Sequence, residues 1–261
     1  MSHSGVPQIL KFLRSLNGGM TQEQVAGRLN VSTSLIAKFE TGRLVPMPDT
    51  AKLLDELFGS GDLVQSTSAA ARRTTPQEWF RQWPDMEREA VAIRWHEANY
   101  VPGLLQTEAY ARAVLTSGLL DADEVEAQVA LRMERQAAVF GRERMPVCTF
   151  IVDELALLRG EPRSMLKEQL AHLVEMSTRP KIFIHVVPRS AGLYVGQMGP
   201  LILASLPGGS DAAFLEDQAG GRVLAEPDQV AAMARAWDAI RSVALPRDMS
   251  RDLIVRMADE L

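Results

Sequence analysis

The chain has 261 residues, enough for one large domain or two of ordinary size, since a domain typically has roughly 100–200 residues. Hydrophobic residues make up 46% and charged residues 23%, which excludes wholesale disorder, and no stretch approaches the roughly 20 uninterrupted apolar residues of a membrane helix. The net charge of −5 hides an asymmetry, because residues 1–60 carry six basic against five acidic side chains and residues 84–261 carry 19 against 26.

The first 60 residues read as short helices separated by turn residues. Residues 1–10 lack a basic segment followed by a long apolar run, so we expect no secretory signal there. Apolar side chains recur at helical spacing from Ile9 to Leu16, and Asn17-Gly18-Gly19 then breaks the pattern. A further helix is predicted over Thr50–Phe58.

Between these helices the sequence predicts a helix-turn-helix. Thr21 and Gln24 fit a capping box, so the first helix covers Thr21–Leu29, and the small Ala26 lets a second helix approach closely. The residues predicted to form the small core are Val25, Leu29, Val31, Ile36 and Phe39.

The turn and the second helix have their own signals. Asn30 takes the turn position that needs a left-handed backbone, which few residues besides glycine tolerate. Ser32 is the predicted N-cap of the second helix, which runs to about Thr41 and stops at Gly42. Leu35 fits either the core or the DNA-facing side.

In a helix-turn-helix the second helix enters the major groove and its first residues meet base edges. Thr33 and Ser34 can donate to or accept from bases, and Lys38 can donate to guanine or to a phosphate. Gln22, at the start of the first helix, and Arg43, after the second, are predicted phosphate contacts. The predicted DNA-binding residues are Gln22, Ser32, Thr33, Ser34, Lys38 and Arg43.

This stretch resembles the DNA-binding domain of Xre-type transcription regulators, the family of phage repressors and Cro, over about 50 residues. The matching segments are Thr21-Gln22-Glu23-Gln24-Val25-Ala26, Val31-Ser32, Ile36 and Phe39-Glu40-Thr41-Gly42-Arg43. The resemblance implies a mainly α, lambda-repressor-like domain, with Asn30 in place of the usual glycine. With Lys38 as its one cation, the reading helix has modest non-specific affinity, which favours a homodimer on two half-sites about 34 Å apart.

A linker is predicted next. Residues 59–76 are rich in Gly, Ser, Thr and Ala, although the Ala-rich part fits a connecting helix equally well. Arg72 and Arg73 fit a solvated linker better than a contact to the DNA backbone, and Trp79 and Trp83 are expected to pack at the start of the second domain. The predicted division is therefore 1–60 for DNA binding, 61–83 as linker or connecting helix, and 84–261 for regulation and dimerisation.

The second domain mixes strands with helices. Its β-rich apolar runs are Val147–Val152, Ile182–Val187 and Leu201–Leu206, with weaker candidates at Ala90–Trp95 and Ala212–Leu215. Long helical stretches lie between them, without a regular βαβα alternation, so we predict an α+β domain.

Further motifs in this domain resemble actinomycete WhiJ-like regulators, which pair an Xre domain with a C-terminal domain of poorly defined function. The matching segments are Tyr100-Val101-Pro102-Gly103-Leu104-Leu105-Gln106-Thr107, Tyr110-Ala111-Arg112, Arg132-x-x-Arg135-Gln136, Asp153-Glu154-x-Ala156-Leu157, Gln169-Leu170-x-x-Leu173 and Arg179-Pro180. The resemblance implies transcription control and a small BldB-like partner protein encoded nearby, in some cases antitoxin-like. Residues 214–218 depart from the family pattern.

Most other polar features have ordinary structural interpretations. Pro102–Thr107 reads as a turn into a helix capped by Thr107, with Tyr110 packed beneath, more readily than as a ligand site. His96 and His185 read as hydrogen-bonded core residues. Glu87 and Glu89 are expected on a solvated face.

The remaining candidate residues do not indicate catalysis or metal binding. Asp153-Glu154 fits a helix cap better than catalytic carboxylates, and Gly208-Gly209 and Gly220-Gly221 read as turns. Cys148 is expected to be an inert packed thiol, and a single cysteine can form neither an internal disulfide nor a cysteine-based zinc cluster. We therefore expect no catalytic residues, no cofactor and no metal site.

Together these observations predict a cytoplasmic, sequence-specific transcription regulator that binds double-stranded DNA and not a membrane. Its C-terminal domain would respond to a ligand or to the small partner. The alternative is an antitoxin-like interaction module that neutralises that partner, which the weak charge of residues 1–60 slightly favours. An enzyme in the C-terminal domain is disfavoured, because no nucleophile–base pair, metal cluster or phosphate loop stands out.

Overall fold

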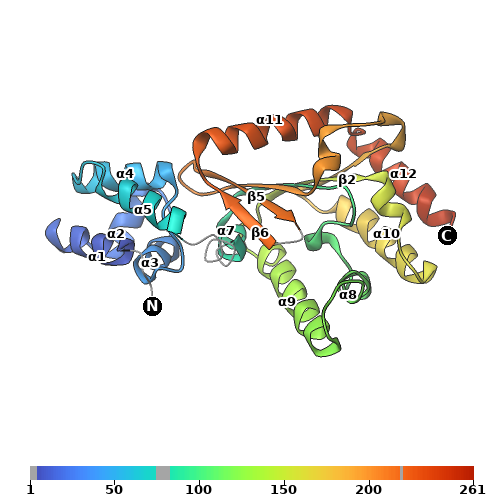
Figure 1. The fold of residues 1–261 in the computed structure, drawn as a ribbon, viewed down its shortest axis with the longest axis horizontal. Helices are drawn as coiled ribbons and strands as arrows, with labels where there is room; N and C mark the ends of the chain where they lie inside the picture. The colour runs from blue at the N-terminus through green and yellow to red at the C-terminus, as the bar shows by residue number, and fades with distance from the viewer. Residues whose placement is uncertain (1–4, 75–82, 218–219) are drawn as a thin grey trace. The chain divides into compact units, whose positions relative to one another are not determined.

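The computed structural model describes residues 5–74, 83–217 and 220–261 (Figure 1). The chain divides into two compact units. The first unit comprises residues 1–91 and 203–232, and the second comprises residues 92–202 and 233–261. The predicted packing role of Trp79 and the pattern at residue 218 lie outside the described residues.

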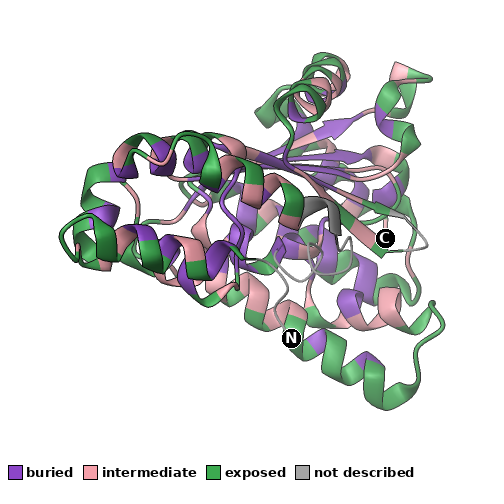
Figure 2. Ribbon diagram, turned by 60° about the vertical axis from the view of Figure 1, so that its left-hand side comes forward, coloured by how far each residue is buried: buried purple, intermediate pink, exposed green. Residues whose placement is uncertain are grey.

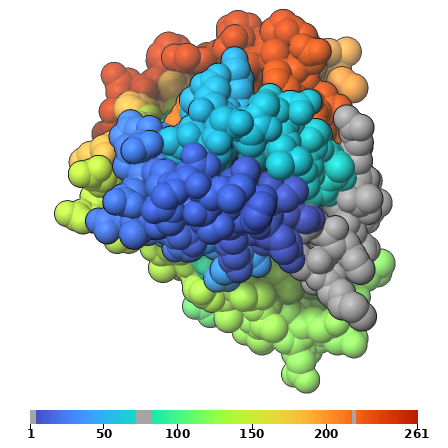
Figure 3. Space-filling view, turned by 90° about the vertical axis from the view of Figure 1, so that its left-hand side faces the viewer, coloured from blue at the N-terminus to red at the C-terminus, as the bar shows by residue number. Residues whose placement is uncertain are grey.

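The first unit is helical at its N-terminal end. Its helices are α1 (Val6–Leu16), α2 (Gln22–Leu29), α3 (Thr33–Thr41), α4 (Pro48–Phe58), α5 (Leu63–Thr74) and α7 (Trp83–Glu89). Figure 3 shows α1 and α2 in dark blue at the viewer's side, with α4 and α5 in lighter blue and cyan. The Ala-rich segment forms the helix α5. Of the two predictions for it, an unstructured linker or a helix, the helix is correct. Trp83 is buried, as predicted.

The second unit contains a parallel β–helix–β arrangement. Its elements are β1 (Ala92–Glu97), α8 (Glu108–Thr116), α9 (Ala122–Phe140), β2 (Val147–Asp153), α10 (Arg163–Thr178), β3 (Ile182–Val187) and α12 (Arg247–Asp259). The pairs β1–β2 and β2–β3 are both parallel, with Phe150 opposite Trp95 and Ile184. Strands and helices therefore alternate regularly from β1 to β3, and the expectation that they do not is wrong for this part of the chain. The physical reason is that parallel neighbouring strands need a crossover connection, which helices supply here.

The sheet has six strands in the order β3-β2-β1-β4-β5-β6. Here β4 is Leu201–Ser205, β5 is Asp211–Asp217 and β6 is Gly220–Leu224, followed by α11 (Pro227–Val243). The pair β5–β6 is antiparallel, so the sheet is mixed and the predicted α+β class is confirmed. The five predicted strands exist with small boundary shifts, but Gly220-Gly221 begins β6 and is not the turn that the sequence suggested.

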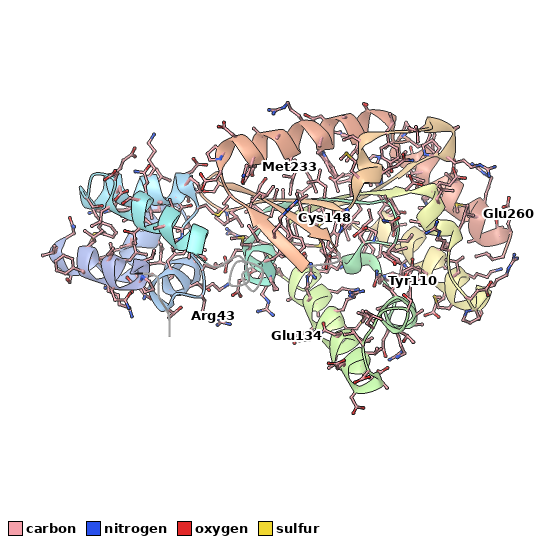
Figure 4. All side chains as sticks on the ribbon, viewed as in Figure 1. Arg43, Tyr110, Glu134, Cys148, Met233 and Glu260 are labelled. Carbon is pink, nitrogen blue, oxygen red and sulfur yellow. The ribbon has the colours of Figure 1, made fainter. Side chains whose placement is uncertain are left out.

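Burial along the parallel strands explains their composition. Phe150, Ile151 and Val152 of β2 are fully buried, and Cys148, labelled in Figure 4, is a buried free thiol, as predicted. Figure 2 shows buried residues, in purple, along strands of the sheet. A strand buried on both faces reads as a continuous apolar run and not as an alternation. The core of the second unit is therefore centred on these strands.

The segment between β1 and α8 is held by internal hydrogen bonds. The Thr107 hydroxyl accepts from the Tyr110 amide at 3.2 Å and caps α8, and Tyr110 is buried (Figure 4). The buried Gln106 amide donates to the Val101 carbonyl at 2.6 Å and accepts from Arg132 at 2.7 Å. These contacts confirm the turn-into-helix interpretation.

Side chains from later helices complete that network. Gln136 donates to the carbonyls of Gly103 and Gln106 at 2.8 Å each. Gln169 of α10 donates to the Leu105 carbonyl at 2.8 Å and accepts from the Thr107 amide at 2.7 Å. These polar side chains thus hold one loop in place.

His96 lies fully buried near the carboxyl end of β1. Its Nδ1 is 3.1 Å from the Ile151 carbonyl oxygen and its Nε2 is 3.1 Å from that of Gly196, which confirms a hydrogen-bonded core histidine. Burial is the main cause that lowers the pKa of His96, and the two carbonyls act against it. Nearby, Asp153 accepts from the Leu155 amide at 2.8 Å, the predicted cap, and from the Tyr194 hydroxyl at 2.7 Å.

Candidate nucleic-acid interface

Both ends of α2 follow the sequence prediction. The Thr21 hydroxyl accepts from the Gln24 amide at 3.1 Å, and the Gln24 side chain accepts from the Thr21 amide at 2.8 Å, which completes the capping box. Asn30 ends the helix at φ 54° and ψ 42°, in the left-handed region. The tight turn that sets α3 against α2 therefore begins at Asn30.

Helix α3 is capped and stopped as predicted. The Ser32 hydroxyl accepts from the Leu35 amide at 3.1 Å, and Gly42 stops the helix at φ 77°. Four side chains face the core, which assigns Leu35 to it: Leu35, Ile36, Phe39 and Glu40. Ser32, Thr33, Ser34 and Thr41 are exposed, and these residues form the outer side of α3.

A buried carboxylate ties α1, α2 and α3 together. Glu40 is 3% exposed, and its two oxygens accept from Arg14 Nε at 2.7 Å and Nη2 at 3.1 Å. Gln22 Nε2 donates to Glu40 Oε2 at 2.7 Å. Burial by itself raises the pKa of Glu40, but the hydrogen bonds from Arg14 and Gln22 outweigh it and hold that pKa below its ordinary value.

The two predicted phosphate contacts lie in different situations. The side-chain amide of Gln22 is engaged by Glu40, so its available donors are the backbone N–H groups at the start of α2. Arg43 is exposed just beyond α3 (Figure 4) and makes no hydrogen bond or ion pair with the described residues. It retains all its donors for a phosphate.

Lys38 is paired within the chain. Its Nζ lies 3.0 Å from Glu89 Oε1 and 3.7 Å from Asp85 Oδ1, and its side chain is 14% exposed. The Ser32 hydroxyl donates to Glu89 Oε2 at 3.1 Å. The prediction that Glu87 and Glu89 lie on a solvated face is therefore wrong, because Glu87 is fully buried and Glu89 contacts α3.

Asp55 is a structural residue of this region that sequence analysis missed. It is 2% exposed, and its carboxylate accepts from the amides of Val64 and Gln65 at 2.9 and 3.0 Å and from the Ser60 hydroxyl. Burial raises the pKa of Asp55, but these hydrogen bonds outweigh it and lower the pKa overall. The carboxylate thus caps α5 from α4, and its spacing to Ser60 matches no local capping pattern.

Neither a metal-binding cluster nor a membrane-spanning helix is found among the described residues. Within residues 5–74, 83–217 and 220–261, no group of three or more His, Cys, Asp or Glu side chains is arranged to hold a metal ion. None of the helices described there is long and apolar enough to cross a membrane.

Comparisons with known proteins give two family matches. A family described as "Domain of unknown function (DUF5753)" matches residues 80–256, and a helix-turn-helix domain family matches residues 10–65. No curated protein and no solved structure matches the chain.

Proposed function

Because the chain belongs to the DUF5753 family and carries a helix-turn-helix domain at its N-terminal end, we propose that it is a sequence-specific, Xre-type transcription regulator. In this proposal α3 reads bases in the major groove of double-stranded DNA, and the protein has no enzymatic activity. The proposed functional division is 1–60 for DNA binding, 61–83 as connector, and 84–261 for regulation and dimerisation.

One observation carries the proposal: the capped start of α3 is exposed and polar. Thr33 and Ser34 occupy its first two positions, are exposed, and make no hydrogen bond with other described residues through their side chains. Residues at the N-terminal end of a reading helix meet base edges, and hydroxyls can donate to or accept from any base. Arg43 and the N-terminus of α2 would contact the phosphates on either side.

Dimerisation and regulation complete the proposed mechanism. Two copies would place their α3 helices in successive major grooves, about 34 Å apart. The C-terminal domain would set that separation, and a ligand or a small BldB-like partner would change it by binding one arrangement better than the other. The single cation of α3, Lys38, supports a dimer, because one cation gives little non-specific affinity.

We expect the double variant Thr33→Ala/Ser34→Ala to bind the DNA upstream of its own gene about 5–150-fold more weakly. This loss corresponds to a base contact worth about 1–3 kcal/mol. Its affinity for a scrambled duplex should not change. Fluorescence anisotropy of the full chain at about 50 and about 200 mM salt measures both. Ser164→Ala, an exposed serine in α10, is the matched control. Equal losses on both duplexes, or none on either, would contradict base reading by these residues.

The alternative, an antitoxin-like module that neutralises a small partner, is favoured by one contact. Lys38, the cation of the reading helix, is already paired with Glu89. On this alternative, Thr33→Ala and Lys38→Ala leave neutralisation of the small protein encoded nearby intact, as measured by pull-down and by growth. On the regulator proposal, the same variants lose repression or activation of the upstream promoter.

A further inference from the structure

Helix α7 turns an acidic side toward α3 within the first unit. Both carboxylate oxygens of Glu89 accept from α3 donors, one from Lys38 Nζ at 3.0 Å and the other from the Ser32 hydroxyl at 3.1 Å. Asp85 precedes Glu89 by one helical turn, and its Oδ1 lies 3.7 Å from the same Nζ. Two acidic residues of α7 thus converge on two predicted DNA-binding residues.

The three charged side chains of this contact are largely shielded from water. The side chains of Lys38, Asp85 and Glu89 are 14%, 12% and 15% exposed. Beside them α3 and α7 leave a cavity of about 10 Å³, room for at most one water molecule. Its lining includes Leu35, Phe39, Met47, Met86, Glu89 and Leu206. The helices therefore meet closely, but the contact between them is not completely filled.

The other end of α7 is attached to the sheet portion of the first unit. The Trp83 ring stacks on Phe214 of β5, with centroids 4.9 Å apart and an interplanar angle of 21°. A buried hydrogen bond of 2.8 Å between the hydroxyls of Thr50 and Ser210 joins α4 to the β4–β5 turn. Helix α7 is thus held by β5 while its acidic side contacts α3.

The Glu89 carboxylate offers α3 the same kind of acceptors that DNA offers. Two oxygens facing an ammonium and a hydroxyl match the acceptor pair of a phosphate, or O6 and N7 of guanine. A duplex that uses Lys38 and Ser32 must take both donors from Glu89. The negative charges of Asp85 and Glu89 also repel phosphates that approach this end of α3.

We infer that α7 is an internal competitor of DNA, which keeps Lys38 and Ser32 from the duplex until α7 moves away from α3. This inference rests on the proposed DNA-binding function. The measured affinity is then the intrinsic affinity multiplied by the fraction of molecules with α7 displaced. An effector that draws α7 away from α3 would raise DNA affinity without touching the DNA.

Glu89→Gln tests the competition, because it keeps the shape of the side chain and removes the charge that holds Lys38. We expect it to bind the upstream duplex about 5–10-fold more tightly than the wild type, if about a tenth of wild-type molecules have α7 displaced, since complete displacement then raises the affinity tenfold. The control is Glu56→Gln, which removes the same charge from an exposed position on α4 and should change affinity less than about twofold. In the Lys38→Ala background, Glu89→Gln should lose most of its effect.

The outcomes separate this inference from the proposed function. If neither the wild type nor Glu89→Gln binds the upstream duplex in preference to the scrambled one, the proposed function fails and the inference fails with it. If the wild type binds selectively and Glu89→Gln behaves like Glu56→Gln, only the inference fails. Amide hydrogen exchange on the wild type gives a measurement independent of any variant. Exchange at residues 83–89 should accelerate when the duplex is added, and unchanged protection would overturn the competition.

Discussion

Glu40→Gln is expected to lower the free energy of unfolding of the first unit by about 2 kcal/mol, since it removes the negative charge from a partly buried ion pair. The Glu40 carboxylate is 3% exposed and accepts from Arg14 and Gln22. Without its charge, the guanidinium of Arg14 lies partly buried opposite a neutral amide. Urea unfolding followed by circular dichroism measures the loss, and Glu56→Gln, an exposed carboxylate on α4, should change it by less than about 0.5 kcal/mol.

The ion pair between Glu40 and Arg14 also makes the free energy of unfolding decrease in acid. The pKa of Glu40 is lowered in the folded protein, so its contribution is complete at neutral pH. The contribution is lost as the pH falls below about 4.3, the ordinary value for an unfolded glutamate, toward the lowered folded value. Glu40→Gln should therefore lose less stability than the wild type between about pH 5 and about pH 3. Parallel curves for the two proteins would contradict this role.

Gly196→Ala is expected to cost the second unit about 2–4 kcal/mol, from overpacking and a strained hydrogen bond. A Cβ at this position would collide with His96 Nε2 and with the Tyr194 ring. His96 is fully buried, so the imidazole has little space to give way. Gly27→Ala is the matched control, because Gly27 lies within α2 and no atom lies within 4 Å of the added Cβ. This variant should stabilise the folded protein by up to about 1 kcal/mol, since alanine favours the helix more than glycine does.

Thermal unfolding of the two glycine variants checks this contrast. In the wild type, the lowered pKa of His96 favours the neutral ring in the folded state, so acidification below about pH 6.5 reduces stability. Gly196→Ala should weaken that dependence if the collision displaces His96 from its two carbonyls. A variant that unfolds at the wild-type temperature would show that the Gly196 segment moves aside freely.

The helix-turn-helix could be predicted because its signals are local. Thr21, Asn30, Ser32 and Gly42 each act on a backbone position within a few residues of themselves, and all four take their predicted conformations. The five apolar strands were found for a similar reason, since a buried strand differs in composition from its neighbours. Local patterns therefore fixed the elements and the outer side of α3.

What could not be predicted depends on residues far apart in the chain. In the sequence, Glu89 resembles an ordinary surface charge. Its hydrogen bond to Lys38 joins residues 51 positions apart, so it is evident only once α7 is known to lie against α3. The two glycines that begin β6 look like a turn, because only pairing with β5 makes them a strand. The apolar runs of β1, β2 and β3 indicate burial on both faces, but which of these strands pair depends on residues far apart in the chain. The contact between Glu89 of α7 and Lys38 of α3 therefore could not be predicted before the fold was known.

The division of the first unit into two stretches of sequence has a consequence for synthesis of the protein. Residues 92–202, which belong to the second unit, separate α7 from β5 along the chain. Phe214 therefore leaves the ribosome about 125 residues after Glu89, a delay of roughly 6–25 s at about 5–20 residues per second. During that interval Trp83 lacks its stacking partner and Thr50 lacks Ser210. The competition inferred for α7 then predicts that a nascent chain holds DNA more readily than the finished protein.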